Sequence, residues 1–181
     1  MSEKYKFSDP KGLYFVTLTI VYWIDLFTRP DYIHTIIGSL RYCQQKKGLI
    51  IHAWVIMPSH LHMIISSDKE DLSSIIRDFK KFTAKKIIHL LSEINESRRE
   101  WLIKAFSKAA SKLKRIKSLK IWQDGCHPIL LDNNTMIDQR LNYIHENPVV
   151  AEIVNSSFHY KLSSATNYAG LGGLIDVKII E

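Results

Sequence analysis

Two strongly β-forming runs, separated only by a proline and a serine, occupy the middle of the chain. The first run is Leu49–Met57, and the second begins at His60 and continues to Ser66. β-Branched and aromatic residues favour strands, whereas Pro58-Ser59 suits a turn and not a central ladder. A connection this short joins antiparallel neighbours. The pattern therefore predicts an antiparallel strand pair on which the rest of the fold must be built.

Apolar residues at helical spacing predict a helix on each side of this strand pair. Before it, the run from Pro30 to Lys47 repeats apolar residues every three or four positions and is followed by Gly48. A basic last turn followed by glycine is a normal helix end. After the pair, Asp71 or Ser73 can cap a second helix with a broad apolar stripe. Helices therefore flank the strand pair along the chain.

Further elements are expected toward both ends of the chain. Residues 13–20 are rich in aromatic and β-branched residues, which predicts a first strand. A last helix begins at Asn133 or Asn134, and we expect it to fray near Asn147 because a proline follows. Residues 174–180 could add an edge strand.

Length and composition favour one intracellular domain. The chain has 181 residues, 46% of them hydrophobic, and its two cysteines lie far apart, which suits a reducing compartment. It has neither a long apolar run nor the apolar region of a signal peptide, so we expect no membrane association. We expect a single domain over residues 1–181, with a basic helical insertion at about 93–121 and a C-terminal tail at 150–181.

Positive charge is concentrated in one segment. The chain has a formal net charge of +7, whereas residues 98–120 hold nine Lys or Arg against one acid, Glu100, a local excess of +8. One interpretation is a solvated helix face plus a linker. The other is contact with a phosphate backbone, because the local excess exceeds the charge of the whole chain.

The second strand begins with a pair of histidines that could form half of a metal site. Successive side chains of a strand point to opposite faces, so His60 and His62 would share one face while Leu61 enters the core. Eight histidines in a chain of this length would give about 0.35 such pairs by chance. The pair alone is therefore equally compatible with two half-buried structural histidines.

A tyrosine in the last predicted helix adds a second candidate. Tyr143 would share a helix face with Glu146 and Asn147, while Ile144 points into the core. In isolation this is also the pattern of an ordinary amphipathic tyrosine.

Together, these segments resemble a known family. Val55–Ile64, VIMPSHLHMI, resembles the HUH motif (histidine, bulky apolar residue, histidine) of single-tyrosine transposases. The sequence WQDG at Trp122 and the later YIHENPV at Tyr143 resemble the tyrosine-helix region of the REP-associated tyrosine transposases. YKLSSATNYAG, residues 160–170, is similar to a segment that follows this helix in the same branch. The resemblance extends from about residue 13 to 170.

The resemblance implies a ferredoxin-like α+β domain. A central antiparallel sheet would carry the histidine pair, and a flanking helix would bring the tyrosine alongside. By the family's pattern His60, His62 and Asn147 bind a divalent metal, Mg²⁺ or Mn²⁺, and Tyr143 is the nucleophile. The phenol must lose its proton, and His145, Glu146 or a water molecule held by the metal are the alternatives for accepting it.

The implied activity is cleavage and rejoining of single-stranded DNA by a tyrosine transposase through a 5′-phosphotyrosine, next to hairpins. The alternatives are an HUH nickase of the replication or relaxase type and a non-catalytic module that binds hairpin DNA or RNA. The protein would act as a monomer or homodimer in the bacterial cytoplasm, associated with the nucleoid.

Contacts to this DNA can also be predicted. The candidates for phosphate contacts are Lys80, Lys81, Lys85 and Arg115. Trp54 and Trp122 could stack on bases, although tryptophans in such apolar surroundings are more often buried in the core.

Overall fold

The chain contains both strands and helices, and the computed structural model describes it over residues 6–69, 71–111 and 119–180. The elements are, in order, β1 (Tyr14–Thr19), η2 (Val21–Trp23), η3 (Leu26–Thr28), α1 (Pro30–Lys47), β2 (Leu49–Met57), β3 (His60–Ser67), α2 (Leu72–Glu93), α3 (Arg99–Ser111), β4 (Ile129–Leu130), α4 (Asn134–Val150), η4 (Ser157–His159) and α5 (Ala165–Tyr168).

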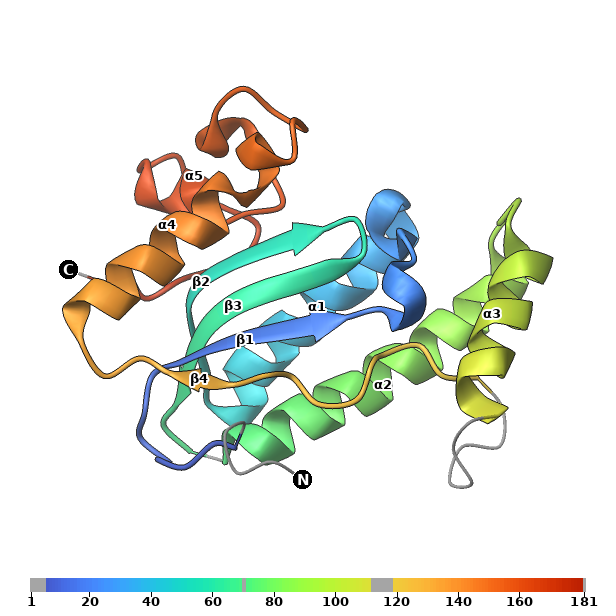
Figure 1. Cartoon of the computed structure of the whole chain (residues 1–181), viewed down its shortest axis with the longest axis horizontal. Helices are drawn as coiled ribbons and strands as arrows, with labels where there is room; N and C mark the ends of the chain where they lie inside the picture. Colours follow the sequence, from blue (N-terminus) through green and yellow to red (C-terminus); the bar gives the residue numbers. More distant parts are fainter. Residues whose placement is uncertain (1–5, 70, 112–118, 181) are drawn as a thin grey trace.

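The predicted strand pair forms the hairpin β2–β3, with Met57 opposite His60 across the Pro58-Ser59 turn. The sheet has the order β2-β3-β1-β4, and each neighbouring pair is antiparallel (Figure 1). Helices connect β1 to β2 and β3 to β4, as a ferredoxin-like α+β domain requires. The predicted fold class is confirmed.

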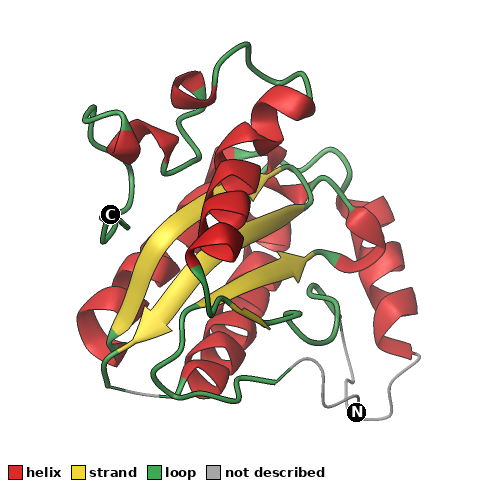
Figure 2. Ribbon diagram, turned by 60° about the vertical axis from the view of Figure 1, so that its left-hand side comes forward, coloured by secondary structure: helices red, strands yellow, loops and turns green. Residues whose placement is uncertain are grey.

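Helices cover both faces of the sheet. Val16 and Leu18 of β1 pack with α1 and α2 in the larger core, whereas Phe15, which points to the other face of the strand, packs under α4 in a smaller core. Figure 2 shows α4 crossing the near face of the sheet, and α1 and α2 lie behind it. Side chains of one strand are therefore divided between two separate layers.

The helix ends follow the local sequence. Gly48 closes α1 with φ +72°, a backbone conformation that residues with a Cβ rarely adopt, and its N–H donates to the carbonyl of Cys43. At the start of α2, the Asp71 carboxylate accepts hydrogen bonds from the backbone N–H groups of Ser73 and Ser74. Asp71, not Ser73, is therefore the cap.

Two predictions about the C-terminal part are wrong. α4 does not fray near Asn147 but continues to Val150, with Pro148 inside it. Proline forfeits one helical hydrogen bond, yet its fixed φ suits a helix and its ring is buried here. The ladder resumes after it, because the N–H of Ala151 donates to the carbonyl of Asn147 at 3.0 Å.

Residues 174–180 are not an edge strand. The segment lies along β2, where the N–H of Lys178 donates to the carbonyl of Ile51 at 2.9 Å. The register of β2 shifts between Ile51 and Ala53, and the Nδ1–H of His52 donates to the carbonyl of Lys178 at 3.1 Å. A bulge at the sheet edge thus prevents a regular ladder.

α3 falls within the segment predicted to be a basic insertion, and this division of the chain stays a prediction. Arg98, the residue before α3, forms ion pairs with Asp25 at 2.7 Å and with Glu96 at 3.5 Å, and these acids hold its side chain in place. Within residues 6–69, 71–111 and 119–180, no helix has the length and apolar character needed to cross a membrane.

Candidate active site

The histidine pair lies at the start of β3, on the face of the sheet that α4 covers. Thr19 pairs with His60 and Thr17 with His62 across β1 and β3, so the same face carries Phe15 and Ile64 of the smaller core. His62 is 5% exposed and His60 is half-buried. The strand alternation predicted from the sequence therefore places both rings on one face.

Each imidazole is oriented by a neighbouring hydroxyl. Nδ1 of His62 lies 2.8 Å from Oγ1 of Thr17, and Nδ1 of His60 lies 3.1 Å from Oγ of Ser59. The ring centroids of the two histidines are 4.7 Å apart. Because the Nδ1 atoms are occupied by hydroxyl groups, the Nε2 atoms are the ones left to meet a ligand or substrate.

Burial keeps both rings neutral. Desolvation lowers the pKa of His60 below its ordinary value. It also lowers the pKa of His62 to about 3, with smaller contributions from His60 and the Arg140 guanidinium. A neutral imidazole has the lone pair that metal binding or proton acceptance requires.

α4 brings Tyr143 to this pair. Its hydroxyl oxygen lies 3.4 Å from Nε2 of His62, and the ring centroids of the two residues are 5.1 Å apart. Tyr143 is 45% exposed, whereas Ile144 next to it is fully buried under the helix. The phenol is therefore anchored beside the histidines and still open to solvent.

Sequence reasoning missed two residues that complete this cluster, Phe15 and Arg140. The Phe15 ring stacks on His62 with centroids 5.3 Å apart, and it meets Tyr143 edge to face at 6.1 Å. The guanidinium of Arg140 lies over the same ring, 4.9 Å from its centroid. Arg140 precedes Tyr143 by three positions in the helix. Residues at this spacing share a helix face, so the sequence could have indicated that Arg140 lies near Tyr143.

The polar neighbours of Tyr143 in sequence lie in different places. Asn147 follows by four positions on the same side of α4 and is half-buried, and Glu146 is exposed. His145 instead turns to the C-terminal segment, where its Nε2 lies 2.9 Å from Oγ of Ser164 and burial lowers its pKa to about 4. This tie holds His145 away from Tyr143, so the interpretation of His145 as proton acceptor loses its support.

The donor set of the cluster suits a divalent cation. Two neutral imidazoles, each oriented by a second hydrogen bond, are an ordinary half-site for a transition metal. Among the described residues, no group of three or more His, Cys, Asp and Glu side chains is placed to hold a metal ion. A metal here would need further oxygen ligands, such as the amide of Asn147, water or the substrate.

The lysines predicted to bind phosphate lie elsewhere. Lys80 donates to the carbonyls of Gln123 at 2.7 Å and Gly125 at 2.6 Å, which ties that loop to α2. Lys81 and Lys85 are exposed, but α2 packs on the sheet face opposite to the histidines. The structure therefore does not bring these three lysines to the candidate site. Arg115 lies outside the described residues.

The tryptophans divide into a buried and an exposed pair. Trp54 is 0% and Trp122 4% exposed, and the indole N–H of Trp122 donates to Thr83. Base stacking by these two is thus excluded by burial. Trp23 and Trp101, which sequence reasoning passed over, are 59% and 54% exposed.

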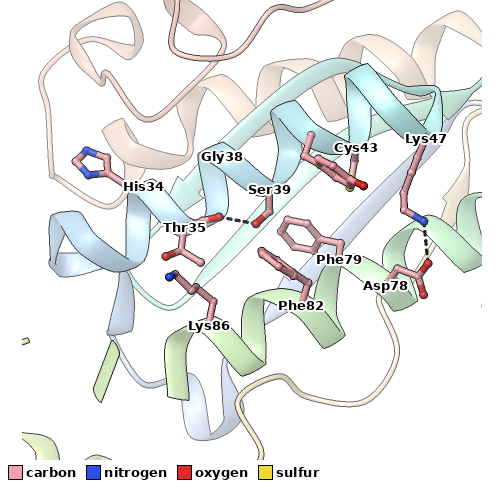
Figure 3. Close-up of a pocket in the computed structure, with 11 residues that line it drawn as sticks. His34, Thr35, Gly38, Ser39, Cys43, Lys47, Asp78, Phe79, Phe82 and Lys86 are labelled. Atoms are coloured by element: carbon pink, nitrogen blue, oxygen red, sulfur yellow. Dashed lines mark hydrogen bonds and ion pairs between the residues drawn. The ribbon is translucent and has the colours of Figure 1, made fainter. Parts of the chain in front are cut away.

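A largely apolar cavity of about 650 Å³ lies between α1 and α2 (Figure 3). Phe79 and Phe82 of α2 project toward α1 there, and a Lys47–Asp78 ion pair of 2.8 Å closes one end. The helices that form it pack on the face of the sheet opposite to α4. It is therefore separate from the histidine–tyrosine cluster.

A protein family and a solved structure are similar to this chain. Residues 16–109 match the family described as "Transposase IS200 like", more than half of the chain. That match includes the histidine pair but ends before α4. A solved structure of a REP-associated tyrosine transposase bound to a REP hairpin is similar over 100% of this chain and 94% of that one, with 22% identity and a TM-score of 0.61. At that identity the likeness shows the fold. No curated protein matches the chain.

Proposed function

The chain belongs to the IS200-like transposase family, and from this we propose that it cleaves and rejoins single-stranded DNA with Tyr143 as the nucleophile. The observation that carries the proposal is the 3.4 Å approach of the Tyr143 hydroxyl to Nε2 of His62, within one chain. The family match does not include α4, so this geometry is independent of it. Tyr143 therefore lies beside the histidine motif that the family match includes, and it is the candidate nucleophile for an activity of the transposase type.

In the proposed reaction the Tyr143 oxygen attacks the phosphorus of a DNA phosphodiester. A bond forms between this oxygen and phosphorus, and the bond from phosphorus to the 3′ oxygen breaks. The products are a 5′-phosphotyrosine and a DNA strand with a free 3′-hydroxyl, which takes up a proton. The energy of the phosphodiester stays in the covalent bond, so a 3′-hydroxyl can reverse the step and join strands.

Residues around the phenol have distinct roles in this proposal. The Tyr143 hydroxyl lies beside Nε2 of His62, the nitrogen that is proposed below to hold the ion, so the phenol proton passes to Glu146 or to a water molecule instead. Phe15 fixes the His62 ring by stacking, which limits how far the nitrogen can move. Arg140 supplies the positive charge nearest to this cluster on α4, where negative charge develops during attack. Partial exposure of Tyr143 leaves room for a DNA strand.

We further propose that His60, His62 and Asn147 hold Mg²⁺ or Mn²⁺. Two imidazoles favour Mn²⁺ over Mg²⁺ in intrinsic affinity. When bound, such an ion would neutralise charge on the scissile phosphate. The lowered pKa values of the two histidines support this assignment, because they leave the rings unprotonated and ready to ligate.

A DNA hairpin next to the cleavage site is the proposed substrate. The support is the fold shared with a REP-associated tyrosine transposase whose structure contains a REP hairpin. The net charge of +7 agrees with an anionic partner.

The proposal predicts a covalent adduct that depends on Tyr143. The protein is incubated with Mn²⁺ and a hairpin oligonucleotide carrying single-stranded flanks, labelled at either its 5′ or its 3′ end. Only the 3′ label should stay with the protein after denaturation, because the tyrosine is joined to the 5′ phosphate of the downstream fragment. Tyr143→Phe should form no adduct, since phenylalanine has no nucleophilic oxygen.

Tyr42→Phe is the matched control, because Tyr42 is also exposed but lies on α1 on the other side of the sheet. It should form the adduct as the unmodified protein does. Tight hairpin binding without an adduct in either Mn²⁺ or Mg²⁺ would instead identify a non-catalytic DNA-binding module.

A further inference from the structure

A groove beside the candidate site combines exposed aromatic rings with lysines. It lies between η2 and α3, has a volume of about 730 Å³, and is lined by residues 22–25 on one side and by Trp101, Lys104 and Lys108 on the other. Neither the nucleophile nor the histidine pair lines it. The chemistry proposed above therefore leaves this groove without a role.

The groove holds the two exposed tryptophans of the chain. Of the four tryptophans, Trp54 and Trp122 are buried, whereas Trp23 and Trp101 are 59% and 54% exposed and both line this groove. Large aromatic side chains are usually buried at least in part, so a pair of them exposed at one place indicates a surface for a ligand.

The backbone at Trp23 is held in an unfavourable conformation. Trp23 has φ +55° and the residue before it, Tyr22, has φ +58°, a region that residues with a Cβ rarely adopt. Hydrogen bonds fix the turn, with Val21 donating to Ile121 and Trp23 donating to Ile20. Such strain is retained mainly where the surrounding structure enforces it, and it clusters at binding and active sites.

The groove is continuous with the candidate active site. The indole of Trp23 meets the His60 ring edge to face, with centroids 5.2 Å apart. The backbone also connects the two, because Ile20, at the start of η2, donates its N–H to the carbonyl of Ser59 beside His60 at 2.9 Å. A strand of DNA lying at the histidine pair would therefore extend directly over Trp23.

Charge in the groove is suited to a phosphate backbone. Trp101, Lys104 and Lys108 recur at three- and four-residue spacing on the exposed side of α3, whereas Leu102 and Phe106 are fully buried on the other side. The one carboxylate that lines the groove, Asp25, is paired with Arg98 at 2.7 Å. Positive charge therefore dominates along the wall formed by α3.

We infer that this groove binds the unpaired nucleotides that flank the scissile phosphate, with bases stacked on Trp23 and Trp101 and phosphates near Lys104 and Lys108. Aromatic platforms beside a basic track are the general means of holding single-stranded nucleic acid without reading its sequence. The inference rests on the proposed function, since it names the part of the substrate that lies next to Tyr143. It also gives the predicted basic insertion a role.

The test compares two hairpin oligonucleotides, one with a single-stranded thymidine tail and one whose tail has the same backbone but abasic sites. Binding is measured by fluorescence anisotropy of the labelled DNA. Stacking of one base on an exposed ring changes affinity by about tenfold, so the thymidine tail should bind about tenfold more tightly than the abasic tail. Trp101→Ala should reduce this preference to the part that Trp23 supplies. Trp101 is exposed, so its replacement leaves the core unchanged.

Phe82→Ala is the matched control, because Phe82 is 60% exposed on α2 and lines the cavity between α1 and α2, not this groove. It should keep the preference for bases. Equal binding of the two tails by Tyr143→Phe protein with no further change, or an unchanged preference when Trp101→Ala is added, would overturn the inference.

A second measurement tests the lysines. Lys108→Ala should weaken binding of both tails and reduce the slope of log affinity against log salt by about one. Lys85→Ala, an exposed lysine on α2, should leave the slope unchanged. An unaltered slope in Lys108→Ala would contradict a phosphate contact at this position.

These measurements are made on Tyr143→Phe protein, so that no strand is cleaved. Base-dependent binding without adduct formation in the unmodified protein would then refute the catalytic proposal alone. Adduct formation without base-dependent binding would refute the groove alone.

Discussion

At the scale of single residues, the candidate site is decided by what each side chain touches. His62 contacts a hydroxyl on one side, a stacked Phe15 ring on the face and the Tyr143 phenol at Nε2. His145 has the same chemistry but is bound to Ser164, so it serves the structure instead. Arg140 becomes notable only because its guanidinium lies over Phe15, beside both His62 and Tyr143.

Arg140→Ala should slow single-turnover DNA cleavage by about a hundredfold, because removing one group that stabilises developing negative charge costs this order of rate. DNA affinity should fall much less. Arg140→Lys should recover part of the rate, since it keeps the charge but not the planar contact with Phe15.

Arg77→Ala serves as control, since Arg77 is an exposed arginine on α2. It should cleave at the rate of the unmodified protein. A cleavage rate in Arg140→Ala within twofold of the original would show that the guanidinium takes no part in the reaction, and that its place over Phe15 is structural.

At the scale of elements, α4 has a different task on each side. One side presents Arg140 and Tyr143 to the sheet face with the histidines, and Ile144 anchors the helix in the smaller core. The other side carries His145, whose ring meets Tyr168 edge to face at 4.9 Å. The helix is therefore fixed from below by the sheet and laterally by the C-terminal segment, which restrains the position of the phenol.

The buried tie at His145 predicts a pH-dependent stability. Burial lowers the pKa of His145 to about 4 in the folded protein, below the 6.5 of the free side chain. As the pH drops below 6.5, His145 therefore binds a proton in the unfolded chain before it does so in the folded protein. The contribution of this group to the free energy of unfolding is complete above pH 6.5 and is lost as the pH drops toward 4. Between about pH 7 and about pH 5 the expected loss from this group is about 2 kcal/mol.

Between about pH 7 and about pH 5 the free energy of unfolding of His145→Gln should fall by about 2 kcal/mol less than that of the unmodified protein. The reason is that glutamine can form a hydrogen bond with Ser164 but does not titrate. The measurement is urea unfolding at both pH values. His159→Gln, at an exposed position, should follow the unmodified protein. Identical pH dependence in His145→Gln would mean that this imidazole is as free to protonate in the folded state as in the unfolded one.

At the scale of the whole molecule, residues 174–178 connect α1 to the edge strand β2. The carbonyl of Leu174 accepts a hydrogen bond from Nε of Arg41 on α1 at 2.9 Å, and Lys178 bonds the backbone of β2. Between them, Ile175 is 1% exposed and belongs to the larger core under α1. The segment thus closes the edge of the sheet that β2 would otherwise expose.

Ile175→Ala should therefore lower the free energy of unfolding by about 2–4 kcal/mol, the usual cost of truncating a buried isoleucine. Leu171→Ala, 69% exposed four positions earlier, should change it by less than about 0.5 kcal/mol. Urea unfolding measures both. A similar small change in the two variants would show that the segment is held by its backbone contacts and not by Ile175.

The sequence by itself determined β1, β2, β3, the helices α1, α2 and α4, and the face of β3 on which the histidines lie. Periodicity and turn residues are local, so β2 and the Asp71 cap could be predicted without any knowledge of the tertiary structure. Local rules failed at Pro148, which the surrounding packing keeps within α4, and at residues 174–180, where a bulge in a distant strand prevents pairing.

Only the tertiary structure decided which polar side chains share a site. Contacts between β1, β3 and α4 join residues as far as 128 positions apart, as in the edge-to-face contact of Phe15 and Tyr143, and no local pattern encodes such distances. The same packing assigned Lys80 to a loop on the far face and exposed Trp23 next to His60. A residue's type sets the chemistry it can perform, whereas its neighbours across the fold decide whether it performs that chemistry.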